Sequence, residues 1–152
     1  MEHRSVYDPE VYREVTGRIN RLTAESTPAW GRMSVGQMLS HCAEVQEVFS
    51  GEKPLQNTPL FARLVKGVIR KGVLGDRPYS QGLRTHPQYR QTEPKEFDRE
   101  KMRLLDGLER FVTMDEAAAA RIEHPLFGRM SREERGWGIY KHLDHHLRQF
   151  GV

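Results

Sequence analysis

The chain has 152 residues, 37% hydrophobic and 30% charged, and its 24 basic and 21 acidic residues leave a formal net charge of +3. No apolar run approaches the roughly 20 residues that cross a bilayer, no secretory signal precedes the first polar segment, and the single cysteine excludes an intramolecular disulfide. We therefore expect one cytoplasmic domain over residues 1–152 without a membrane partner, and the interspersed charges argue against nucleic acid as its main ligand.

The first predicted helix covers residues 8–25. Asp8 is a favourable N-cap, and Pro9 occupies the first helical position, where proline is well tolerated. The segment is expected to end before Pro28. At helical spacing, its predicted buried face consists of Val11, Val15, Ile19 and Leu22.

The second predicted helix begins at Ser34 and stops near Gly51. Ser34 and Gln37 form a capping box, in which each side chain accepts from the other residue's free backbone N–H. Its predicted buried face consists of Met38, Cys42, Val45 and Phe49.

Residues 52–94 form a long connection. A short amphipathic helix is predicted over residues 59–71, whereas residues 73–94 are too rich in glycine and proline for regular structure. Irregular connections of this length in a compact domain are usually functional, so a lid or a mobile segment is expected here.

Two more long helices are predicted in the second half of the chain, over 95–113 and 131–150. The first is expected to bury Met102, Leu105, Leu108 and Val112. An alanine-rich segment, 115–122, either continues it or forms a separate turn. The second opens with a capping box of Ser131 and Glu134 and is expected to bury Ile139, Tyr140, Leu143, Leu147 and Phe150. No segment alternates as a strand does, so the pattern predicts an all-α, four-helix bundle.

Three of the seven histidines lie in the last predicted helix. His142 and His146 are four residues apart and share one face, so both imidazoles can reach one divalent ion. His145 lies on the side of Lys141 and Arg148, which predicts exposure to solvent. The spacing alone is a weak signal, because such pairs are more often surface residues than ligands.

A stable metal site needs a third protein ligand, and His41 is the best candidate for it. His41 borders the predicted buried face of the second helix, where a hydrogen-bonded core-edge histidine is the alternative. The other candidates, His3, His86 and His124, lie in a terminus, in the long connection and before a proline.

A glutamate, the cysteine and three loop arginines are further candidate functional groups. Glu44 lies one turn after His41 and is a candidate for orienting a substrate or transferring a proton, although an exposed helix glutamate is the commoner reading. Cys42 falls on the buried face, which favours a structural thiol over a nucleophile. The loop residues Arg77, Arg84 and Arg90 are candidates for binding the carboxylates of a thiol cofactor, with solvated loop charges as the alternative.

The chain resembles the DinB-like superfamily in two segments, WGRMSVGQMLSHC (30–42) and HPLFGRMSREERGWGIYKHLDHHLRQFG (124–151). That superfamily includes YfiT-type metal-dependent hydrolases and bacterial transferases of low-molecular-weight thiols. The nearest likeness is to a bacterial branch whose members end in a similar HLDHHLRQFG tail.

The resemblance implies a four-helix bundle with a three-histidine site for zinc or nickel. His41 matches the ligand on the second helix, His142 and His146 match the pair on the last, and Gln149 matches the end of an HxxxHxxQ pattern. It further implies a thiol transferase or hydrolase that acts on a small molecule, with a low-molecular-weight thiol as co-substrate. Homodimers are common among such proteins, and residues 59–71 offer a mixed apolar and basic surface for one. The alternative is a non-catalytic binding or stress-response protein whose metal site is structural or empty.

Overall fold

The computed structural model describes residues 3–152 and is mostly helical, as the sequence predicts. The strands of a small antiparallel hairpin are β1 (Glu123–His124) and β2 (Gly128–Arg129). A 3-10 turn, η1 (Pro87–Tyr89), lies in the long connection. The α-helices are α1 (Pro9–Arg21), α2 (Val35–Phe49), α3 (Leu60–Leu64), α4 (Lys66–Leu74), α5 (Phe97–Thr113), α6 (Glu116–Ala120) and α7 (Arg132–Gln149).

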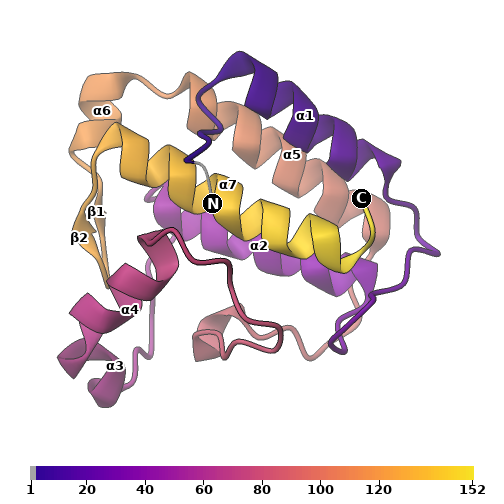
Figure 1. Cartoon of the computed structure of the whole chain (residues 1–152), viewed down its shortest axis with the longest axis horizontal. Coiled ribbons are helices and arrows are strands. Elements are labelled where there is room, and N and C mark those ends of the chain that lie inside the picture. Colours follow the sequence, from indigo (N-terminus) through magenta and orange to yellow (C-terminus); the bar gives the residue numbers. More distant parts are fainter. Residues whose placement is uncertain (1–2) are drawn as a thin grey trace.

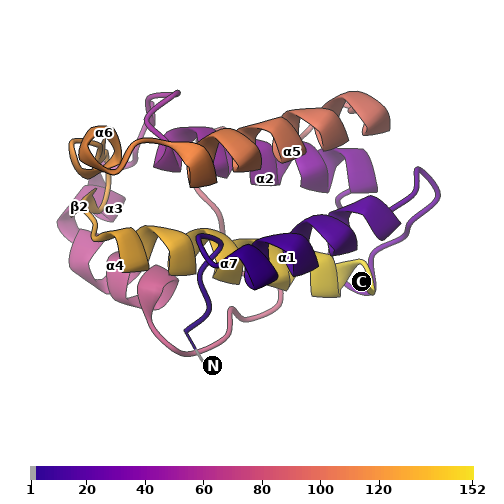
Figure 2. The ribbon, with the colours of Figure 1, turned by 90° about the horizontal axis from the view of Figure 1, so that it is seen from above.

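The four longest helices lie in two layers (Figure 2). Helices α2 and α5 form one layer, and α1 and α7 form the other. Helix α5 packs along α2, and α7 contacts both α2 and α1. The smaller elements α3, α4 and the hairpin gather at one end of these layers (Figure 1).

The predicted helix starts are confirmed by side-chain caps. The Asp8 carboxylate accepts from two backbone N–H groups of α1, and the capping boxes of Ser34 with Gln37 and of Ser131 with Glu134 are both complete. Each cap satisfies N–H groups that have no partner within their helix, so these three starts are defined by local chemistry.

The helices bury the apolar faces that define the core. The predicted faces of α1, α2 and α7 are all buried, and each large aliphatic side chain removed from water contributes about 1.5–3 kcal/mol. Of the face predicted for α5, Leu108 is buried and Leu105 and Val112 are partly buried against the core, but Met102 is 62% exposed. Helix α5 also buries Leu104 and Phe111, which the predicted face does not include. Gly107 lies on the same side, where an added Cβ would meet the Gln46 side chain of α2 at 2.7 Å.

Two predicted helix bounds differ from the structure. Helix α1 ends at Arg21 rather than at residue 25, because Leu22 turns to extended backbone and a local turn follows in which Thr23 and Ser26 bond to each other. The short helix predicted over 59–71 is two helices, α3 and α4, interrupted at Val65 and continued to Leu74.

The region between α5 and α7 holds two elements. Helix α6 is separate from α5, because Met114 between them is not helical. The expectation of no strand is wrong at the hairpin, where Glu123 pairs with Arg129 and His124 pairs with Gly128. A strand of two residues is too short to show the alternation of apolar and polar residues by which strands are predicted.

The long connection is held against α7 by buried polar contacts. Lys141 is 1% exposed, so the expectation that its side of the helix faces solvent is wrong. Its ammonium donates to the backbone oxygens of Gly72, Val73 and Gly75, at 3.1, 3.1 and 2.6 Å. The Trp137 indole also donates to the backbone oxygen of Leu74, at 2.9 Å. Carbonyls at the end of α4 thus anchor it to α7.

Within residues 3–152, no helix combines the length and the apolar character needed to cross a bilayer. The exposed large apolar side chains of α3 and α4 are Leu60, Phe61, Leu64 and Val68. They lie in the segment expected to form a homodimer surface, and that expectation stays a prediction.

Candidate metal centre

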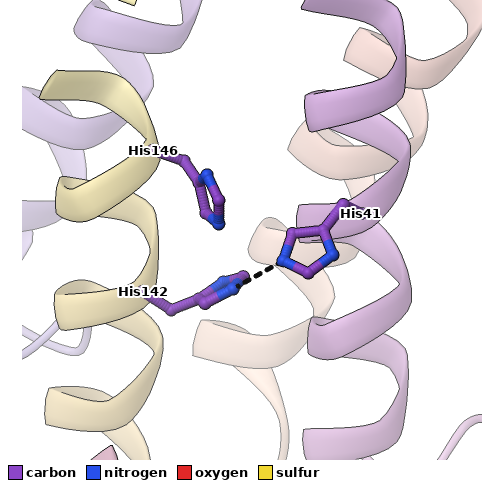
Figure 3. Close-up of side chains that lie close together, drawn as sticks. All are labelled: His41, His142 and His146. Carbon is purple, nitrogen blue, oxygen red and sulfur yellow. Dashed lines mark hydrogen bonds between the residues drawn. The ribbon is translucent and has the colours of Figure 1, made fainter. Parts of the chain in front are cut away.

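Three histidine side chains converge between α2 and α7. Figure 3 shows His41 pointing from α2 toward His142 and His146, which project from successive turns of α7. One nitrogen of each ring lies within 4.8 Å of the others, so the three could hold a metal ion. These are the three ligands predicted from the sequence.

The backbone carbonyl of Tyr89 orients His41. The Nδ1 atom of His41 lies 2.9 Å from this oxygen. Because a carbonyl oxygen only accepts, Nδ1 carries the proton and Nε2 presents its lone pair. That Nε2 lies 3.0 Å from Nε2 of His142.

Gln149 orients His146 in the same way. The side-chain oxygen of Gln149 lies 2.8 Å from Nδ1 of His146, and its amide nitrogen donates to the Trp30 carbonyl at 2.6 Å. The second contact fixes which end of the amide faces the ring, so Nδ1 of His146 donates and Nε2 presents a lone pair. Hydrogen bonds of this kind, from the far nitrogen of a ligating histidine, are typical of metal sites.

Burial keeps the three imidazoles neutral. His41 is 4% exposed and His146 is 8% exposed. Desolvation lowers the pKa of His41, and it lowers that of His146 to about 3. Desolvation, followed by the neighbouring histidines, places the pKa of His142 well below its usual value. Neutral imidazole is the form that binds a metal, so the site requires no deprotonation at neutral pH.

The donor set and its spacing fit a divalent ion with nitrogen ligands. On a tetrahedral ion with metal–nitrogen distances of about 2.0–2.1 Å, two ligand nitrogens lie about 3.3 Å apart. The 3.0 Å pair of His41 and His142 is close to that separation, and a ring nitrogen of His146 lies within 4.8 Å of both. Three imidazoles leave a fourth position for water or substrate.

The three histidines line one end of a cavity of about 820 Å³. Its walls are mostly apolar and come from α2, α4, α7, the hairpin turn and the long connection. The predicted irregular segment 73–94 therefore contributes directly to the site, through residues that include Tyr79, Leu83 and Tyr89. Cavities of this size hold small organic molecules.

Glu44 lies in an ion-pair network and not among the residues that line the cavity. Its carboxylate contacts Lys53 at 2.9 Å and Arg103 at 3.1 Å and accepts from Gln88. Burial would raise its pKa, but hydrogen bonds from Lys53 and Arg103 outweigh it and lower the pKa. A role of Glu44 in catalysis stays a prediction.

The three candidate arginines are placed differently. Arg84 and Arg90 line the cavity with exposed side chains, whereas Arg77 is exposed and does not line it. Arg32, which sequence reasoning missed, joins the lining from the segment before α2.

His145 does not join the other three histidines, but the expectation that it faces solvent is wrong. Its ring is partly buried, 5.9 Å from that of Trp30 and 5.6 Å from that of Tyr79. Burial lowers its pKa. Tyr79 comes from the long connection, and the periodicity of one helix cannot predict that another segment will cover His145.

Sequence reasoning also missed Tyr89 and His124. Tyr89 orients His41 through a backbone oxygen, which leaves no side-chain signal. From the sequence, His124 is only a weaker candidate for the third ligand, yet it lines the opposite end of the cavity from the metal site, beside Phe49.

Comparison with known proteins gives one family. No curated protein and no solved structure matches the chain. The model of the DUF1569 family, described as a protein of unknown function, matches residues 4–151. The chain therefore belongs to the DUF1569 family.

Proposed function

We propose that this protein is a divalent-metal-dependent enzyme that acts on a small molecule at His41, His142 and His146. The reaction is transfer of a low-molecular-weight thiol to an electrophile or hydrolysis, and the metal is zinc or nickel. The observation that carries the proposal is the pair of oriented rings: Tyr89 and Gln149 each take an Nδ1–H, so that two Nε2 lone pairs face one point at the end of a large cavity.

A divalent ion held by three neutral imidazoles keeps its full charge, and it would stabilise a bound thiolate or hydroxide near neutral pH. The chain supplies the rest. His41, His142 and His146 would hold the ion, the Tyr89 carbonyl and Gln149 fix the rings, and mostly apolar walls surround the cavity.

The resemblance to the DinB-like superfamily supports this proposal. We infer that α1, α2, α5 and α7 form the four-helix bundle of that superfamily, with the site between its second and last long helices. Arg84 and Arg90, exposed where they line the cavity, suit the carboxylates of a small thiol.

The competing function is a binding or stress-response protein in which a metal stabilises the fold without turnover. A three-histidine site also permits this function, because closing α2 against α7 through one ion would stabilise their packing. Activity and stability therefore have to be measured on the same metal-loaded protein.

The test uses protein purified without an affinity tag, stripped with a chelator and reloaded with zinc or nickel. Loss of thiol is followed with a panel of small thiols and 1-chloro-2,4-dinitrobenzene, and hydrolysis with 4-nitrophenyl esters. We expect turnover by the loaded wild type, loss of turnover in His142→Ala, and its retention in His145→Ala.

His145→Ala is a matched control, because it removes a neighbouring imidazole of the same helix that is not part of the triad. Metal binding that raises the melting temperature without turnover on either panel would contradict the enzyme and support the structural alternative.

A further inference from the structure

The cavity continues well beyond the three histidines. His41, Val45 and Phe49 line it at four-residue intervals along α2. Gly138 lies opposite on α7, where an added Cβ would stand 3.1 Å from the Phe49 ring. Eight residues of helix rise about 12 Å, so the Phe49 end lies about that far from the His41 end.

The Phe49 end is closed by the turn between β1 and β2. His124, the last residue of β1, is 2% exposed and lines the cavity. Its ring stacks on Phe127, with centroids 4.3 Å apart, and meets the Phe49 ring edge to face at 4.8 Å. One polar ring is thus enclosed by apolar ones.

Two backbone contacts fix the tautomer of His124. Its Nδ1 accepts from the N–H groups of Leu126 and Phe127, each at 3.2 Å. An atom that accepts two hydrogen bonds carries no proton, so the proton of the neutral ring is on Nε2. Desolvation lowers the pKa of His124 to about 4, which keeps the ring neutral at pH 7.

The resulting Nε2–H is a buried donor that no described residue accepts. Buried polar groups are nearly always hydrogen-bonded. An unpartnered N–H on a residue that lines a cavity therefore calls for an acceptor from outside the chain. An apolar side chain would close this end equally well, whereas this histidine adds a buried N–H donor without an acceptor among the described residues.

We propose that this end of the cavity binds an apolar small molecule that carries an oxygen acceptor, such as a ketone, ester or amide carbonyl, which accepts the hydrogen bond from Nε2 of His124. The inference rests on the proposed function only in placing the reacting group of that molecule about 12 Å away, at His41. Recognition by His124 itself requires no metal, so it can be tested on stripped protein.

The test compares two probes of nearly equal shape, 2-acetylnaphthalene and 2-isopropenylnaphthalene, which differ by a carbonyl oxygen in place of a methylene group. Their affinities for chelator-treated protein are measured by calorimetry. The ratio of the two affinities cancels the apolar contacts that the probes share. Comparing this ratio between protein variants cancels the difference in hydration between the probes.

The informative variant is His124→Asn. The Oδ1 of asparagine can occupy the place of Nδ1 and accept from Leu126 and Phe127, so the turn is retained while Nε2–H is removed. Tyr89→Phe is the matched control, because the Tyr89 hydroxyl is another buried polar group of a cavity-lining residue without a partner within residues 3–152.

We expect the ketone-to-alkene affinity ratio to fall about threefold to tenfold in His124→Asn, the range of one hydrogen bond, and to stay unchanged in Tyr89→Phe. An equal ratio in wild type and His124→Asn would overturn the proposal, as would a ratio that falls only in Tyr89→Phe. Failure of the wild type to bind either probe would overturn it too.

A measurement on the wild type covers the case in which His124→Asn does not fold. In ¹⁵N-labelled protein, the Nε2–H proton of His124 should move downfield on addition of the ketone and stay in place with the alkene. An unmoved resonance at saturating ketone would contradict the contact. Neither readout depends on metal, so failure of the metal centre leaves this result independent.

Discussion

The side-chain oxygen of Gln149 lies 2.8 Å from Nδ1 of His146, while the amide nitrogen of the same side chain donates to the Trp30 carbonyl at 2.6 Å. One residue near the end of α7 thus orients a histidine of the triad and ties the helix to the segment that precedes α2. Two substitutions of Gln149 can separate the orienting contact from the contact that ties the helix.

Gln149→Met removes the acceptor and should weaken zinc binding about 10- to 100-fold, the usual effect of losing such a contact. Gln149→Glu keeps an acceptor for His146 but places a carboxylate oxygen against the Trp30 carbonyl. It should lower the melting temperature yet hold zinc more tightly than Gln149→Met does. Competition titration with a chromophoric chelator measures both affinities, and equal affinities would argue against the orienting role.

Stability should fall as the pH drops below about 6.5, the pKa of an unfolded-state histidine. The folded-state pKa of His124 is about 4, so between these values the unfolded chain binds a proton that the folded chain does not. The unfolded state is therefore favoured as the pH falls through this window, and nothing is lost from this group above it.

Comparing His124→Asn with the wild type isolates the effect of His124 protonation on stability. In urea unfolding, the free energy of unfolding should fall between pH 7.5 and pH 5.0 by about 2 kcal/mol less in the variant than in the wild type. The contributions of the other titrating groups cancel, because both proteins contain them. Parallel declines would mean that His124 titrates normally in the folded chain.

Lys141→Met should lower the free energy of unfolding by about 1–3 kcal/mol. It removes the donor to three partly buried carbonyl oxygens at the end of α4, and acceptors left without a donor are costly to shield from water. Lys53→Met is a matched control, because the Lys53 side chain is 42% exposed, and partly exposed ion pairs contribute roughly 0–1 kcal/mol. Equal losses would show that the carbonyl contacts of Lys141 contribute little.

Cys42 should be inert in the folded protein. It is 1% exposed, and burial raises the pKa of its thiol, so little thiolate forms. Ellman's reagent should react only as fast as the chain unfolds, and Cys42→Ala should keep the proposed activity. Rapid stoichiometric labelling of native protein would reopen a nucleophilic role.

The features that the sequence predicts well are local ones. Capping boxes at Ser34 and Ser131 act over three residues, and the spacing of His142 and His146 follows from the helical repeat. These patterns give the long helices and the three histidines. Met102 shows their limit, because its apolar side chain is 62% exposed although its spacing matches that of the buried Leu108.

The burial of several side chains could not be predicted from the sequence, because it depends on contacts with distant segments. Lys141 is buried because carbonyls of α4 reach it, and His145 is covered because Tyr79 of the long connection folds over it. The unpartnered Nε2–H of His124 becomes apparent only when the backbone of the hairpin turn and the Phe49 ring are placed around the imidazole. Loops without periodicity determine these positions, and the cavity is built largely from them.

If His41, His142 and His146 bind one divalent ion, the protein must carry metal in one-to-one stoichiometry. Tag-free protein is equilibrated with zinc or nickel, and the bound metal is measured by mass spectrometry after dialysis. We expect one ion per chain in wild type and in His145→Ala, and a large loss in each single alanine variant of the triad. A wild type without stoichiometric metal, or a loss in His145→Ala as large as in His142→Ala, would contradict it.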